Sequence, residues 1–134
     1  MKPLLYSLCL TTLLIVAAPN GGSIAADSPW KKHVVHEGER CNTAVAGDFT
    51  HDGKPDIISN SGGKTRLFVG PSWTEYVIDE NKEHGFIHSE SFDVDGDGDP
   101  DFIGARYQPG LVAWLECPAN PTEGKWKVRV VDDR

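Results

Sequence analysis

A nine-residue acidic loop occurs twice in the chain, once from Asp48 and again from Asp93. Both copies read Asp-x-x-x-Asp-Gly-x-Pro-Asp and are followed by two apolar residues. A second motif, Trp-x-x-x-Val followed by Val or Ile, begins at Trp30, Trp73 and Trp126. Two motifs that recur in the same order and at a similar period indicate a fold made of repeated supersecondary units.

The segments between these motifs have the composition of short strands. They are rich in β-branched and aromatic residues and are bounded by Gly, Pro, Asn and Asp. No window after residue 26 keeps a 3.6-residue period, so we expect almost no helix. Strands are predicted at 43–46, 56–59, 65–69, 75–78, 88–92, 101–105, 111–115 and 127–131. Four short antiparallel strands in about 45 residues are typical of one β-propeller blade. The sequence therefore predicts an all-β fold with two four-stranded antiparallel blades, at residues 41–79 and 86–132.

The second acidic loop places a carboxylate at every other position, at Asp93, Asp95, Asp97, Asp99 and Asp101. Calcium takes six to eight oxygen ligands at about 2.3–2.6 Å, and a tight loop of alternating carboxylates can wrap them around one ion. Without a cation, five carboxylates this close would repel one another. The loop predicts a calcium site in which Asp99 offers its backbone carbonyl and the other four offer their side chains. A solvated acidic turn is the alternative.

The first loop has fewer acids. Thr50 and Lys54 replace two of the five, so that a calcium ion there would have Asp48, Thr50, Asp52, Asp56 and the carbonyl of Lys54 as ligands. Fewer anionic ligands predict a weaker site, and a turn held only by hydrogen bonds is the alternative. Neither loop is an EF-hand, because that loop needs helices on both sides and a Glu at its twelfth position, where the second loop has Gly104.

Together, the acidic loop between strands and the Trp motif resemble the FG-GAP/VCBS repeats of integrin-α-like β-propellers, and the variants in secreted bacterial proteins are the most similar. The resemblance covers residues 30–134. It implies that calcium at the ten loop residues named above is structural and braces the turn between the first two strands of a blade. Complete propellers have about four to eight blades, so two blades imply an incomplete ring. Residues 30–36 resemble the last strand of a further blade, and we expect a strand there.

The N-terminus has the pattern of an export signal. Lys2 precedes an uncharged apolar run at residues 4–18, and small residues at Ala25 and Ala26 offer cleavage sites. We therefore predict a signal peptide at residues 1–26 and a secreted, periplasmic or cell-surface protein. A membrane anchor is the alternative, but the run falls short of the about 20 residues that span a bilayer. We expect no membrane insertion after cleavage.

The charge of the remaining chain disfavours some partners. Removing residues 1–26 leaves 20 acidic and 12 basic residues, a net charge of −8. An acidic surface argues against nucleic acid as a partner. One calcium ion in each loop would bring the net charge to about −4. Cys41 and Cys117 remain in the chain and can pair in an oxidising compartment, but their positions in sequence do not establish the necessary proximity.

The sequence contains no Ser-His-Asp grouping, phosphate-binding glycine loop or thiol-metal spacing that would indicate an enzyme. The expected function is that of an exported, calcium-stabilised β-propeller segment that binds or adheres to a protein or carbohydrate ligand. Self-association would complete its ring. One alternative is a part of a propeller-scaffold, lyase-like carbohydrate-processing enzyme, with His88 facing the channel. The other alternative is a truncated fragment without independent function.

Overall fold

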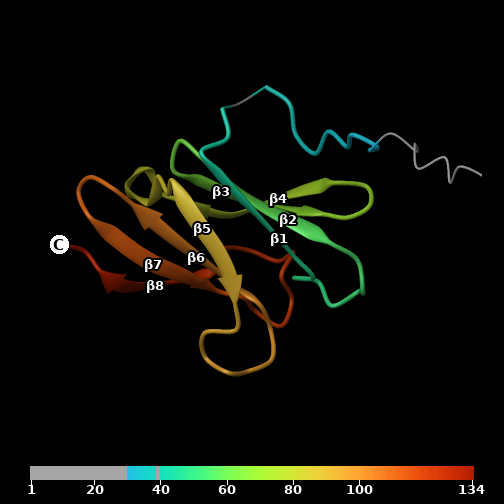
Figure 1. Ribbon diagram of the computed structural model, residues 1–134. Helices are drawn as coiled ribbons and strands as arrows, with labels where there is room; N and C mark the ends of the chain where they lie inside the picture. The colour runs from blue at the N-terminus through green and yellow to red at the C-terminus, as the bar shows by residue number, and fades with distance from the viewer. Residues whose placement is uncertain (1–29, 39) are drawn as a thin grey trace, which may run out of the picture. The chain divides into compact units, whose positions relative to one another are not determined.

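The regular secondary structure of the described chain is almost all β-strand (Figure 1). The computed structural model describes residues 30–38 and 40–134, and the predicted signal peptide at residues 1–26 lies outside the described residues. One compact unit spans His33–Arg134. Its only described helical segment is a single 3-10 turn, η1 (Lys82–His84). The expectation of an all-β fold with almost no helix is confirmed.

Eight strands form two separate four-stranded antiparallel sheets within the described residues. Sheet 1 has the order β1-β2-β3-β4 and sheet 2 the order β5-β6-β7-β8, so each strand pairs with its neighbours in the chain. The strands are β1 (Thr43–Gly47), β2 (Asp56–Ser61), β3 (Lys64–Val69), β4 (Thr74–Glu80), β5 (His88–Phe92), β6 (Asp101–Arg106), β7 (Leu111–Glu116) and β8 (Lys127–Asp132). Each predicted strand is present with both ends within two residues of their expected positions. The sheets do not close into a barrel.

The core lies between one face of each sheet, which we call the inner faces. On sheet 1, Ile58 and Leu67 are paired across β2 and β3 and are fully buried in this core. On sheet 2, Phe102 and Leu115 are paired across β6 and β7 and join the same core. Side chains alternate between the two faces of a strand, so the intervening residues, such as Ile57, belong to the outer faces.

Contacts at three levels fix the two sheets together. The hydroxyl groups of Thr43 and Ser89 lie 2.7 Å apart, between β1 and β5. Directly before β8, the backbone N–H of Trp126 donates to the carbonyl of Ile78 in β4 at 2.8 Å. The Trp126 ring packs edge-on against Phe49, with ring centroids 6.0 Å apart. The loops, the edges and the core all take part in holding the sheets.

The connection between β4 and β5 is largely exposed, but one of its residues, Phe86, is buried between the sheets. Phe86 is fully buried, with its ring centroid 5.8 Å from that of Phe102. It stacks on His84, whose Nδ1 lies 2.8 Å from Asp79 Oδ2. Gly104 makes room for this ring, because a Cβ there would lie 2.5 Å from Phe86. The connection therefore contributes a large aromatic residue to the core.

The strand predicted at residues 30–36 does not form. A strand needs a hydrogen-bonded neighbour, and the two sheets are already complete with four strands each. The end of this segment instead lies against the outer face of sheet 1. The His36 ring packs on Phe68, with centroids 5.3 Å apart, and His33 lies edge-on to Trp73 at 6.5 Å. The strand expected here as the last of a further blade therefore has no partner strand among the described residues.

Among the described residues, no helix has the length and apolar character needed to cross a membrane.

Candidate metal centre

The second acidic loop joins β5 to β6 and is wound around the carboxylate of Asp93. This carboxylate accepts hydrogen bonds from the backbone N–H groups of Gly96 at 2.7 Å, Asp97 at 3.1 Å and Gly98 at 3.0 Å. Gly96 and Gly98 have φ values of 80° and 98°, in the region that favours glycine. The two glycines therefore allow the tight turn, and the first acid of the motif holds it.

Asp101 anchors the other end of the loop at the start of β6. Its side chain is buried, with only 1% of the residue exposed. One carboxylate oxygen accepts from the N–H of Val94 at 3.0 Å and the other from the N–H of Cys117 at 2.8 Å. Burial raises the pKa of the Asp101 carboxyl, and these two hydrogen bonds act in the opposite direction.

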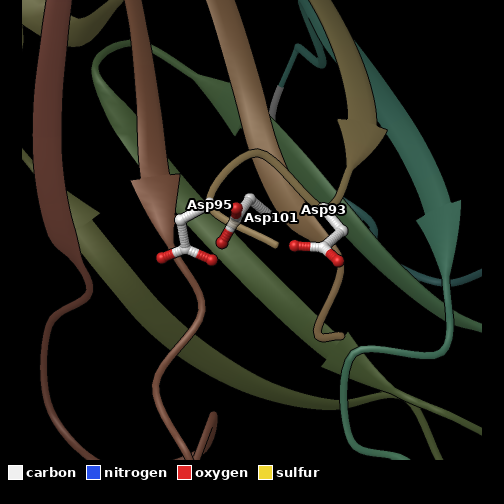
Figure 2. A group of neighbouring side chains, drawn as sticks. All are labelled: Asp93, Asp95 and Asp101. Atoms are coloured by element: carbon white, nitrogen blue, oxygen red, sulfur yellow. The ribbon is translucent and has the colours of Figure 1, made fainter. Parts of the chain in front are cut away.

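Asp93, Asp95 and Asp101 bring their carboxylates together (Figure 2). One oxygen from each lies within 4.8 Å of the others. Two oxygens bound to one calcium ion at about 2.4 Å can be at most about 4.8 Å apart, so this spacing fits a shared cation. Ligands that are all oxygen suit hard cations, a group that includes Ca²⁺, Mg²⁺ and Mn²⁺. The triad can therefore hold a metal ion, and its geometry alone does not select calcium.

The other two predicted ligands lie outside this triad. Asp97 uses a side-chain oxygen to accept from the N–H of Asp99 at 2.9 Å. The Asp99 side chain lies 3.0 Å from Nε2 of His51, which belongs to the first loop. Asp99 was expected to contribute only its carbonyl, so this contact leaves its predicted role open. The structure thus gathers three of the four predicted side-chain ligands.

The first loop has the same backbone framework without the same ligands. Asp48 accepts from the N–H groups of Asp52 at 3.1 Å and Gly53 at 3.0 Å, as Asp93 does from Asp97 and Gly98. His51 and Gly53 have φ values of 57° and 78° and stand where the second loop has its two glycines. The two loops are therefore conformationally alike.

Asp56 corresponds to Asp101 and is fully buried. It accepts from the N–H and the hydroxyl of Thr50, at 3.0 and 2.9 Å, and from the N–H of Gly70 at 3.0 Å. Thr50 thus stands where the second loop has Asp95 and donates a hydrogen bond to the last acid of the loop. Asp95 in its ionised form has no proton to donate in this way.

Lys54 supplies a positive charge within the first loop. Its Nζ lies 2.7 Å from Asp52 Oδ2. This hydrogen bond lowers the pKa of the Asp52 carboxyl and raises the pKa of the Lys54 ammonium. In the part of the chain that the structure describes, Asp48, Asp52 and Asp56 do not form a group like the triad. These contacts favour the alternative of a turn held by hydrogen bonds.

The sequence interpretation did not include the backbone donors that hold the two buried acids. Gly70 follows β3 and Cys117 follows β7, and their N–H groups bind Asp56 and Asp101 respectively. Each of these residues precedes a proline. In the sequence, the proline that follows each of these apolar strands is the only shared feature that could have indicated these donors. The contact between His51 and Asp99 had no such signal, because it depends on how the two sheets pack.

Both cysteines of the described chain are free. Cys117 is buried, and burial raises the pKa of its thiol to about 12, with the nearby Asp99 and Asp101 charges adding to the effect. Cys41 is exposed, and its Sγ lies 3.2 Å from the carbonyl of Thr43. The disulfide that the sequence left open is absent from this structure.

This difference gives an expected labelling pattern. In the chain without residues 1–26, a thiol reagent at neutral pH should modify Cys41 rapidly and Cys117 only on unfolding, because the thiolate is the reactive form. Mass spectrometry of native and urea-treated protein would show one label and then two. A Cys41→Ser variant, which should take up no label while folded, is the control. Rapid double labelling of the folded protein would contradict the burial of Cys117.

Of the histidines, His88 is exposed at the start of β5. With Thr43, Ser89 and Glu90 it lines an open pocket of ≈ 260 Å³. His84 is held by Asp79 and by stacking on Phe86, so its role is structural. Of His84 and His88, only His88 is therefore available for the enzymatic alternative. Loss of a carbohydrate-cleaving activity in His88→Ala would be the test of that alternative.

No protein-family model matches the chain, and comparisons with curated proteins and with solved structures give no match either.

Proposed function

We propose that the chain is an exported, calcium-stabilised segment of a β-propeller that serves as a binding or adhesion module. In this proposal each four-stranded sheet is one blade. The partner would be a protein or a carbohydrate, since the net charge of −7 for the whole chain disfavours nucleic acid.

The observation that carries the proposal is the acidic triad on the loop between the first two strands of sheet 2. Asp93, Asp95 and Asp101 would hold the ion, which supplies positive charge to a loop that carries five carboxylates. Bringing like charges together costs free energy that a bound cation offsets. Because Asp101 begins β6 and Asp93 follows β5, the ion would tie the two strands at this end of the sheet.

The proposal assigns one ion to the chain rather than two. In the first loop the ammonium of Lys54 contacts Asp52, and Thr50 donates to Asp56. These two contacts supply a positive charge and a hydrogen bond where the second loop has carboxylates. The first loop therefore keeps its turn without a metal ion.

Calorimetric titration with Ca²⁺ is expected to give one ion per chain. A ligand at 100 times its Kd stabilises the folded state by about 2.7 kcal/mol. For a domain of this size that corresponds to a rise in Tm of about 10 °C over the protein in EDTA. Mg²⁺ at the same concentration serves as the comparison for selectivity. An absence of binding heat together with an unchanged Tm would refute the calcium proposal, and two equivalent ions would refute the assignment to one loop.

A further inference from the structure

The two sheets pack through faces that are not equivalent in the repeat. Ile58 of sheet 1 lies in the core, but its counterpart in sheet 2, Ile103, does not. Conversely, Phe102 lies in the core and its counterpart in sheet 1, Ile57, does not. The inner face of one sheet thus corresponds to the outer face of the other. A contact of this head-to-tail kind can be repeated between copies of a chain, because each copy keeps one outer face of each type.

The outer face of sheet 2 carries apolar side chains beside charged ones, among them Glu90 and Arg129. Ile103 and Trp114 pair across β6 and β7 and are half-buried. Phe92 and Val131 are 66% and 67% exposed. On sheet 1 the equivalent positions of Ile103 and Trp114 are Ile58 and Leu67, which are fully buried against sheet 2.

The outer face of sheet 1 contains a largely apolar groove of ≈ 460 Å³ and, near it, the Arg66–Glu75 ion pair. The groove is lined by His33, Val35, Lys54, Pro55, Ile57, Pro71 and Trp73. Beside it, Phe68 pairs with Ile57 across β2 and β3. The equivalent pair on sheet 2 is Phe102 with Leu115, which is buried against sheet 1.

We propose that the occupant of these faces is a second copy of this chain, with the outer face of sheet 2 in one copy packed on the outer face of sheet 1 in the next. The new interface would repeat the contact already present between the two sheets. This inference rests on the relation between the sheets that the propeller proposal uses, but it does not depend on calcium.

The repeated interface has specific anchor residues. Inside the chain, Trp126 packs on Phe49, and its N–H donates to the carbonyl of Ile78. In the repeat, Trp73 stands where Trp126 does, Val94 where Phe49 does, and Val131 where Ile78 does. Val94 and Val131 are both exposed, at 39% and 67%. Trp73 of one copy would therefore pack on Val94 of the next, beside Val131.

One position on each outer face carries a charge where the existing contact has an apolar residue. Glu75 pairs with Phe68 across β3 and β4, on the outer face of sheet 1. Arg129 pairs with Trp114 across β7 and β8, on the outer face of sheet 2, and lies 5.9 Å from the Trp114 ring centre. The corresponding positions in the existing contact are Val128 and Tyr76, which both pack against the core. Glu75 already pairs with Arg66, and Arg129 with Glu116, so each charge would reach the interface with a partner in its own copy.

Residues 33–36 compete with this association. His33 and His36 lie against Trp73 and Phe68, on the face that the second copy would cover. Docking must displace these residues, and this step lowers the affinity between copies. We therefore expect the fraction of associated chains to rise over the range of concentrations measured.

Light scattering on the chain without residues 1–26 tests the inference between about 1 and about 100 µM. The mass of the wild type should rise beyond that of a dimer. Trp73→Glu blocks one face and Val131→Glu the other, and each variant alone should remain monomeric. An equimolar mixture of the two should form a 1:1 dimer, because one intact face of each type remains. Val130→Glu is the matched control and should behave as the wild type, since Val130 pairs with buried Ala113 and belongs to the other face.

A monomeric wild type at the highest concentration would overturn the inference. So would a mixture of the two blocked variants that stays monomeric, or a self-association that only one of the two substitutions weakens. Adding Trp73→Glu to the wild type should reduce the mean mass by capping one end, which an unfolded variant cannot do. All measurements are made in Ca²⁺ and in EDTA. An unchanged Tm in EDTA with association intact would refute the calcium proposal and leave the interface standing.

Discussion

Replacing Asp101 by Ala is expected to lower the free energy of unfolding by about 2–5 kcal/mol in EDTA, because two buried N–H donors lose their acceptor. These donors belong to Val94 and Cys117. In Ca²⁺ the loss should be larger still, since the triad loses one of its three carboxylates. Urea unfolding in each condition, at a concentration where the chain is monomeric, measures both effects.

Asp56→Ala is the matched control for this experiment. Asp56 is as buried as Asp101 and also accepts from one N–H of its own loop, that of Thr50, and from one after the next strand, that of Gly70. Because the Thr50 hydroxyl donates to it as well, Asp56→Ala should cost at least as much in EDTA but leave the stabilisation by Ca²⁺ unchanged. If Asp101→Ala and Asp56→Ala reduce the effect of Ca²⁺ equally, the two loops share the metal-binding role and the assignment to the second loop is wrong.

Phe86→Ala is expected to destabilise the chain by about 3–5 kcal/mol, the usual cost of removing a buried Phe side chain. Phe86 lies between the two sheets, in contact with Phe102 and facing Gly104, so its loss leaves a cavity at their interface. Domains are stable by about 5–15 kcal/mol, and this single change can therefore remove much of the total. Urea unfolding of the monomeric protein would measure it.

Phe92→Ala makes the same chemical change on the surface, where 66% of the residue is exposed. It should alter the free energy of unfolding by no more than about 0.5 kcal/mol. A loss for Phe86→Ala as small as that for Phe92→Ala would mean that the connection between the sheets does not contribute to the core as the contacts indicate.

The strands were predictable because their limits are set locally. Asp56 and Asp101 end the Pro-Asp motif of their loops and begin the strands, and two consecutive apolar residues follow each of them. The segment at residues 30–36 has the same Trp-x-x-x-Val pattern but no strand beside it to pair with. A pattern of side chains indicates that a segment is suited to a strand, but the strand forms only where a neighbouring strand is present to pair with it. Phe86 was not predicted as core, since its burial depends on the space over Gly104 in another strand.

The candidate site was predictable in its acids and less so in their roles. The spacing from Asp93 to Asp101 identified the loop, and three of its residues do lie together. The sequence did not distinguish acids that hold the backbone from acids free to bind an ion. Asp48 and Asp93 accept several N–H groups of their own loops. Lys54 was expected to lend a carbonyl, and its ammonium instead contacts Asp52, which its position in the motif did not indicate.

Because the two loops share one hydrogen-bonded framework, the shape of the turn does not depend on the residues that would set its affinity for a metal ion. The amide contacts that Asp48 and Asp93 make are alike, so the turn persists whether position three is Thr50 or Asp95. Under the calcium proposal, a substitution at this position would change metal binding while the loop keeps its turn. Metal affinity and loop shape would then be able to change independently in the two copies of the repeat.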